Sequence, residues 1–234
     1  MSGDGRRARI LAQITDVGAP PDAGKVLAGA CRFAVSNLDL SGCAVMLMSP
    51  GSTVDVLADA GRDAGAIAEL QFTLGEGPCL DAHTSGVPVF ATDLARQGAR
   101  WPSFSAAAAD LGVFAEFSLP LAVGDVGLGT LDLSRHWPGM LDREDLADAL
   151  TVADIATDAV LMLHGSPAGP AVALVEPAAE RRLVVHQATG MIAAQLDSTT
   201  TDALASLRAA AFTSGRPIAD VAGDVVARRV SFRD

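Results

Sequence analysis

A run rich in proline and glycine, Gly165-Ser-Pro-Ala-Gly-Pro170, divides this chain of 234 residues into two stretches with different hydrophobic periodicity. Proline cannot continue a helix and glycine weakens one, so the helical pattern that precedes the run has to end there. Strands and helices are predicted before the run, and only helices after it. We therefore expect two domains, at residues 20–163 and 176–234, joined by a linker at residues 164–175.

The N-terminal stretch carries both helix and strand signals. Residues 22–37 repeat apolar side chains every three to four positions, which predicts a helix, and residues 43–48 form a continuous apolar run typical of a strand. Residues 117–134 contain two further apolar segments joined through Gly124-Asp125, a pair that favours a β-hairpin. Strands at hairpin spacing between helices predict an α+β domain with a mostly antiparallel sheet, followed by a long helix at residues 142–163.

The C-terminal stretch differs in charge as well as in periodicity. Helices are predicted at residues 176–196 and 203–213 and from Pro217 onward. Thr199-x-x-Asp202 resembles a capping box in front of the second of these helices, and Asp22 is a cap candidate for the helix at residues 22–37. The whole chain has a formal net charge of −11, yet residues 181–233 hold seven arginines against four aspartates and sum to +3. An acidic body with a basic helical module is typical of a protein that binds a polyanion, although charge alone does not distinguish it from a solvated surface.

The three cysteines, Cys31, Cys43 and Cys79, are an odd number and cannot all pair within the chain. With no signal peptide, we expect reduced thiols and a cytoplasmic location. Cys79 and His83 stand one helical turn apart, but two ligands do not make a metal site. No phosphate-binding loop, dinucleotide fingerprint or nucleophile elbow is complete, and no apolar stretch is long enough for a membrane span. We expect no enzyme activity, catalytic residue, metal, cofactor or membrane partner.

The segment Val185-His-Gln-Ala-Thr-Gly-Met-Ile192 resembles the first helix of the ANTAR domain, a three-helix RNA-binding module of bacterial transcription antiterminators. The family pattern Gln-Ala-x-Gly-Met/Ile is matched by Gln187, Ala188, Gly190 and Met191. Thr189 stands where the family often has lysine, so a hydroxyl replaces a direct phosphate contact there. The resemblance continues over the next two helices, in Ala203-x3-Leu207-Arg208 and Arg216-x3-Asp220-Val221-Ala222.

Residues 20–163 resemble a GAF domain of the kind fused to ANTAR domains in actinobacteria. The segments that carry the resemblance are Leu74-Gly-Glu-Gly-Pro-Cys-Leu-Asp-Ala82, Gly86-x-Pro88-Val89, Asp93-Leu94, Arg100-Trp-Pro-x-Phe104 and Leu119-Pro-Leu121. GAF domains are typically sensors, so the resemblance implies either a small-molecule ligand of unknown identity or a domain that serves only dimerisation. The candidate pocket residues are Cys79, Trp101, Phe104 and Phe117, although side chains of these types more often belong to a core.

Together, the two resemblances imply an RNA-binding regulator of transcription antitermination. ANTAR proteins act as dimers on paired hairpins in nascent transcripts and read bases in the hairpin loops, so we expect hairpin RNA as partner and a homodimer formed through residues 142–163. Arginine binds phosphate and stacks on bases, and small residues let a base approach a helix or let helices pack closely. The candidate RNA-contacting residues are Arg181, Arg182, His186, Gln187, Ala188, Thr189, Gly190, Arg208 and Arg216.

Two other functions remain open from the sequence. The helices around residues 213–217 resemble a DNA-binding helix-turn-helix, although the third helix has a valine-rich face and offers few base-reading side chains except Arg228 and Arg229. Some GAF domains reduce free methionine sulfoxide with cysteines. That activity would require Cys79 and a partner thiol to be close, exposed and redox-active.

Overall fold

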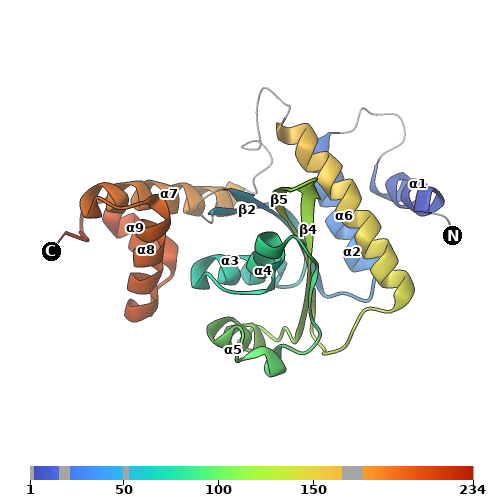
Figure 1. The fold of residues 1–234 in the computed structure, drawn as a ribbon, viewed down its shortest axis with the longest axis horizontal. Coiled ribbons are helices and arrows are strands. Elements are labelled where there is room, and N and C mark those ends of the chain that lie inside the picture. The colour runs from blue at the N-terminus through green and yellow to red at the C-terminus, as the bar shows by residue number, and fades with distance from the viewer. Residues whose placement is uncertain (1–2, 16–21, 50–52, 165–175, 234) are drawn as a thin grey trace.

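A five-stranded antiparallel sheet lies at the centre of the N-terminal part of the computed structural model, which describes residues 3–15, 22–49, 53–164 and 176–233 (Figure 1). The spatial order of the strands is β2-β1-β5-β4-β3, and all neighbours are antiparallel. The strands are β1 (Gly42–Ser49), β2 (Thr53–Gly61), β3 (Val89–Ala91), β4 (Ala115–Val123) and β5 (Val126–Arg135). The predicted α+β class with an antiparallel sheet is confirmed.

Helices cover both faces of the sheet (Figure 1). One face carries α2 (Ala23–Asn37) and α6 (Arg143–His164), with α1 (Gly3–Ile14) packed against α6. The other face carries α3 (Ala64–Leu74), α4 (Pro78–Ser85), α5 (Pro102–Asp110) and the 3-10 helix η1 (Leu94–Gln97). Side chains alternate along the strands, so Phe117 and Leu119 of β4 enter the apolar core under α2 and α6, whereas Glu116 and Ser118 face α3.

Side-chain caps and ion pairs fix the N-terminal helices. Asp22 accepts a hydrogen bond from the backbone N–H of Lys25 (2.9 Å), which begins α2 where the sequence predicts it. The sequence marks the residues of α1 only as a weakly amphipathic arm. This helix packs on α6 because the buried Arg6 forms ion pairs with Glu144 (2.9 Å) and Asp148 (3.1 Å).

The glycine-rich segment 74–82, which carries much of the GAF resemblance, builds the starts of two helices. Gly77 has a φ of +142°, and a Cβ there would lie 2.5 Å from Oε1 of Gln71. This oxygen accepts a hydrogen bond from the backbone N–H of Cys79 (2.8 Å) in the first turn of α4. Glu76 accepts two backbone N–H groups in the first turn of α5 (2.6 and 2.7 Å). The motif therefore positions α4 and α5 on the sheet.

The C-terminal part is a three-helix module made of α7 (Glu176–Leu196), α8 (Thr200–Ser214) and α9 (Ile218–Val226). Thr199 caps α8 by accepting the N–H of Asp202 (3.1 Å), as its capping pattern predicts, so α8 begins earlier than the predicted residue 203. Figure 1 shows the module beside the β2 edge of the sheet. One apolar core runs from the sheet and α3 into the module and includes Met46, Phe72, Ala188, Leu207 and Val225.

Within the described ranges, no helix is long and apolar enough to cross a bilayer. In the same part of the chain, no group of three or more histidine, cysteine or acidic side chains is placed to hold a metal ion.

Candidate nucleic-acid interface

The predicted RNA-reading residues of α7 divide between two sides of the helix. His186, Gln187 and Gly190 are exposed, whereas Ala188 is fully buried and Thr189 is 8% exposed. The Thr189 hydroxyl donates to a backbone carbonyl one turn earlier (2.8 Å). Ala188 therefore serves close helix packing, and the hydroxyl of Thr189 already has a partner inside the module.

A largely exposed strip, in which only Met191 is half-buried, runs along α7 toward its C-terminal end. Its residues stand three or four positions apart and so share one helix face; they are Gln187, Gly190, Met191 and Ala194, which we call the α7 strip. A hollow of about 430 Å³ opens at the end of the strip, and its lining includes Met191, Ala194, Arg228, Ser231 and Arg233. The hollow thus adds two arginines to a strip that offers one amide, at Gln187, among small and apolar residues.

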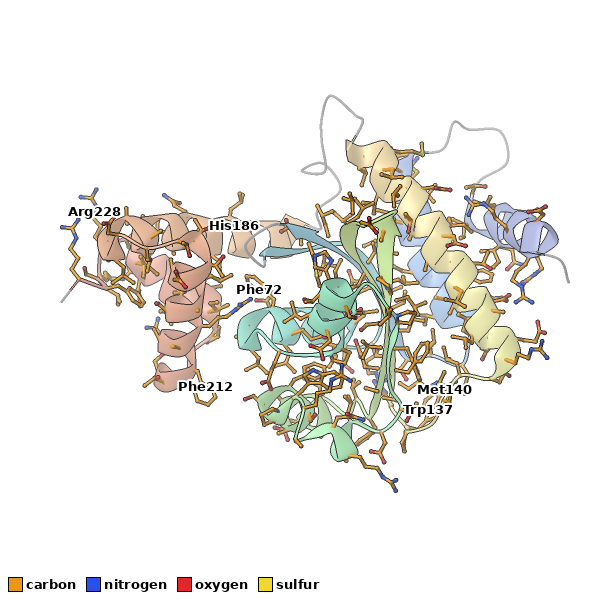
Figure 2. All side chains as sticks on the ribbon, in the orientation of Figure 1. Phe72, Trp137, Met140, His186, Phe212 and Arg228 are labelled. Carbon is orange, nitrogen blue, oxygen red and sulfur yellow. The ribbon has the colours of Figure 1, made fainter. Side chains whose placement is uncertain are left out.

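Arg228 and Arg233 reach this surface because the chain turns back after α9. Arg228 has left-handed backbone (φ +58°), which ends the helix and brings the C-terminal residues beside α7. Figure 2 shows Arg228 and His186 on the same side of the module. Sequence reasoning considered Arg228 only for DNA binding and did not single out Arg233. The positive charge of Arg228 and Arg233 is visible in the sequence. Their position beside α7 depends on the turn after α9, which the sequence pattern did not indicate.

The predicted arginines have different surroundings. Arg208 extends to the sheet part, where its Nε donates to the carbonyl oxygen of Phe72 (2.9 Å) and its guanidinium lies over the Phe72 ring (5.4 Å to the centroid). Arg216 pairs with Asp224 (2.8 Å). Arg208 is therefore held against the sheet part, whereas Arg216 is exposed but paired with a carboxylate. The remaining two candidates have side chains outside the described part of the chain; they are Arg181 and Arg182.

Asp224 neutralises part of the module's positive charge. Its carboxylate pairs with Arg216 (2.8 Å) and with Arg229 (2.6 Å). Hydrogen bonds from these two guanidinium groups hold the pKa of the Asp224 carboxyl below its usual value. The basic groups that line the hollow beside the α7 strip are therefore Arg228 and Arg233.

The four sensor residues predicted for the sheet domain do not come together. Trp101 and Phe104 pack edge to face with ring centroids 6.5 Å apart, in a core under α5. Cys79 belongs to the core shared with the helical module, and Phe117 lies on the opposite face of the sheet. All four are at most 2% exposed, so they contribute to three separate parts of the core.

A buried polar cluster, which sequence reasoning missed, lies between α3 and the sheet. Gln71 donates from Nε2 to Asp132 (3.0 Å) and Glu116 (3.4 Å). Burial raises the pKa of Asp132 to about 7, although Ser118, Gln71 and Thr130 lower it, and burial raises the pKa of Glu116 well above its usual value. Among the described residues, the side-chain atoms that are buried with no hydrogen-bond partner include Glu116 Oε2 and Ser134 Oγ. Unpaired buried polar atoms are costly, so this cluster is a stronger candidate for a sensor site than the four residues predicted from the sequence.

The two alternative functions lose support from the same geometry. Ile218, Val221 and Val225 of α9 are buried in the module, so the valine-rich face of this helix is not available to a DNA groove. All three cysteines are buried and unpaired, and burial raises the pKa of the Cys79 thiol, which lowers its reactivity. Cys31 and Cys43 also lie in the core on the other face of the sheet from Cys79.

Solved GAF domains share the sheet and its helices. The chain resembles the GAF domain of a phosphoenolpyruvate-protein phosphotransferase from Acinetobacter (TM-score 0.54, 11% identity, covering 70% of this chain and 97% of that one). The corresponding domain from Coxiella burnetii gives a TM-score of 0.53 at 18% identity and covers 70% of this chain and 98% of its own. A GAF domain region from Geobacter sulfurreducens PCA gives a TM-score of 0.51 at 15% identity and covers 69% of this chain and 99% of its own. No curated protein matches the chain.

Two family models match the chain in N-to-C order. Residues 22–160 match the GAF domain and residues 175–226 match the ANTAR domain. A GAF domain is a sensor, and an ANTAR domain is the RNA-binding part of antitermination regulators. The sensor match contains the sheet with its buried polar cluster, and the RNA-binding match contains the α7 strip. The chain thus belongs to the GAF domain family and carries an ANTAR domain after its GAF domain.

Proposed function

We propose that this protein promotes transcription antitermination by binding paired hairpin loops in nascent RNA as a homodimer, under the control of its GAF domain. The α7 strip with its adjoining basic hollow is the observation that carries this proposal. We assign residues 20–163 to the GAF domain, 164–175 to the linker and 176–234 to the ANTAR domain. We place the protein in the cytoplasm, where its RNA partner is made.

The α7 strip has the chemistry that reading of loop bases requires. Unstacked bases are recognised by hydrogen bonds to their edges and by stacking. The exposed amide of Gln187 supplies both a donor and an acceptor. Open space surrounds Gly190, since nothing lies within 4 Å of the position a Cβ would take. A base can therefore approach the backbone of α7 there, next to the imidazole of His186.

The basic hollow supplies affinity beside the strip. Phosphate contacts provide most of the binding free energy of such complexes, and arginine also stacks on bases. Arg228 and Arg233 line the hollow at the end of the strip, so one loop can contact both. Ala188 and Thr189 act from the inside of the module by fixing the position of α7.

The α6 helix offers a surface for the homodimer. Leu150 and Leu161 are 44% and 40% exposed, and their spacing of eleven residues places them on one side of the helix. A pair of exposed leucines on one face of a long helix favours helix–helix association with a second copy. Leu150→Glu together with Leu161→Glu should convert the dimer to a monomer in sedimentation equilibrium.

Binding to designed RNAs tests the proposal. The wild-type protein is titrated with a two-hairpin RNA, with the same RNA carrying altered loop bases, and with duplex DNA, each over a salt series. We expect loop substitution and Gln187→Ala each to weaken binding by about tenfold or more. Gln13→Ala, which removes an exposed glutamine from α1, is the matched control and should bind as the wild type does.

Equal, salt-sensitive binding to all three nucleic acids would contradict loop reading and leave only electrostatic attraction. Equal affinities of Gln187→Ala and Gln13→Ala would show that the α7 strip is not the reading surface.

A further inference from the structure

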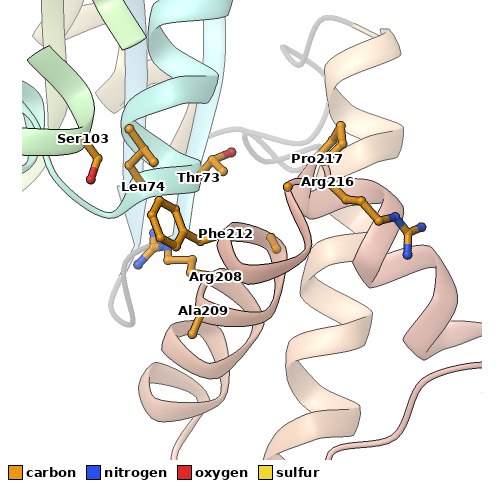
Figure 3. A pocket seen from close by; sticks show the side chains of 10 residues that line it. Thr73, Leu74, Ser103, Arg208, Ala209, Phe212, Arg216 and Pro217 are labelled. Carbon is orange, nitrogen blue, oxygen red and sulfur yellow. The ribbon is translucent and has the colours of Figure 1, made fainter. Parts of the chain in front are cut away.

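A cavity of about 670 Å³ lies between the GAF and ANTAR parts (Figure 3). The GAF part contributes the C-terminal end of α3 and the start of α5, and the ANTAR part contributes α8 and the turn that follows it. A volume of this size is typical of sites for small organic molecules. The lining residues used below are Leu74, Ser103, Arg208, Ala209 and Phe212.

Arg208 lines this cavity and pairs with no carboxylate among the described residues. Its Nε donates to the Phe72 carbonyl, but Nη2 is buried and has no hydrogen-bond partner in the described part of the chain. Burial lowers the pKa of the guanidinium. Arg6 and Arg135 are also buried, and each pairs with carboxylates. Arg208 lacks the anionic partner that these two arginines have. A buried charge without such a partner is costly.

The rest of the lining is mainly apolar. Figure 3 shows the Phe212 ring between Leu74 of the GAF part and the stem of Arg208. Phe212 is 73% exposed, which is unusual for so large an apolar side chain without a partner. Arg216 also borders the cavity, but its guanidinium points away and binds Asp224. One cationic group therefore faces an apolar space with Ser103 at its edge.

We propose that this interdomain cavity binds an aromatic carboxylate. The carboxylate accepts a hydrogen bond from Nη1 of Arg208, the guanidinium nitrogen that is neither bonded to Phe72 nor buried, and the aromatic body packs against Phe212 and Leu74. A monoanion matches the one lining guanidinium that has no carboxylate partner among the described residues. The assignment does not depend on RNA binding.

Such a ligand touches both domains at once. Anything that binds only the docked arrangement stabilises that arrangement by mass action. The ligand therefore favours contact between α8 and α3, and its concentration sets how firmly the ANTAR part is held on the GAF part.

Calorimetric titration of the full chain with 2-naphthoate, and with neutral 2-naphthamide as its isostere, tests the site. We expect the wild type to prefer naphthoate by about tenfold or more. Arg208→Gln should remove this preference. Arg228→Gln is the matched control, because it removes the same charge from the other end of the module, and it should keep the preference (Figure 2).

Ala209→Trp tests the cavity without touching the charge. Ala209 is exposed and lines the cavity, so an indole there fills the space while the core stays intact. We expect this variant to melt as the wild type does and to lose naphthoate binding, and we expect 1 mM naphthoate to raise the melting temperature of the wild type alone. Equal affinity of the wild type for naphthoate and naphthamide would overturn the proposal. Naphthoate binding that persists in Ala209→Trp would also overturn it. Loss of the preference for naphthoate over naphthamide in Arg228→Gln would overturn it as well.

Discussion

Gln71 and Gln187 show how differently the two domains use the same side chain. Gln71 is fully buried and makes hydrogen bonds to Cys79, Glu116 and Asp132. Gln187 is exposed on the α7 strip. The GAF part thus encloses this amide among other buried polar groups, whereas the ANTAR part leaves it open to solvent on the surface that we propose binds RNA. Replacing Gln71 should therefore lower the stability of the protein, whereas replacing Gln187 should weaken RNA binding.

Replacing Gln71 should give the largest effect on stability. Gln71→Ala removes three hydrogen bonds, leaves a buried N–H unpaired and opens a cavity, so we expect a loss of about 3 kcal/mol or more in the free energy of unfolding. Urea denaturation followed by circular dichroism measures it. Gln187→Ala should lie within about 0.5 kcal/mol of the wild type. Equal losses of unfolding free energy in the two variants would contradict the proposed difference between the two glutamines.

The pH dependence of stability probes the same buried cluster. The pKa of Asp132 rises from 3.8 to about 7 on folding, so the native state binds more protons than the unfolded state between these values. The free energy of unfolding should therefore fall as the pH rises from about 4 to 7. Asp132→Asn should flatten this fall and make the protein more stable than the wild type at pH 8. Asp125→Asn, in the exposed β4–β5 turn, controls for net charge; the same flattening there would refute the assignment.

Asp224 allows the smallest and most specific change in the ANTAR part. Asp224→Asn removes the carboxylate that pairs with Arg216 and Arg229, and loss of surface ion pairs should change stability little. The two freed arginines should raise RNA affinity a few-fold and steepen its salt dependence. Filter binding at several salt concentrations measures both quantities. Weaker RNA binding in this variant would mean that Asp224 positions the surface rather than neutralises it.

Much of the fold follows from local signals in the sequence. The bounds of α7 agree with the predicted helix, and Asp22 and Thr199 cap the helices that they were expected to begin. These signals depend only on residues that are neighbours in the sequence, so they can be recognised without knowledge of the tertiary structure. The hairpin of β4 and β5 was found for the same reason, because Gly124 and Asp125 favour a tight turn.

The sites depend on how the elements assemble, and there the sequence is less informative. Glu116, Ser118 and Asp132 alternate with apolar residues, a pattern typical of a solvent-facing strand side, but α3 and α4 cover that side. Arg208 has the charge expected of a phosphate contact, yet the position of the ANTAR part on the GAF part places it against Phe72. The sequence could indicate these residue types but not what covers them.

Photocrosslinking from the RNA itself tests loop reading by the α7 strip most directly. A two-hairpin RNA with 4-thiouridine in one loop is bound to the wild-type protein, irradiated and digested with trypsin, and the crosslinked residues are located by mass spectrometry. We expect crosslinks within residues 186–194 and at residues 228–233, and we expect competitor RNA with altered loops not to remove them. Crosslinks confined to residues 22–160, or spread evenly over the chain, would contradict the assignment of RNA reading to this surface.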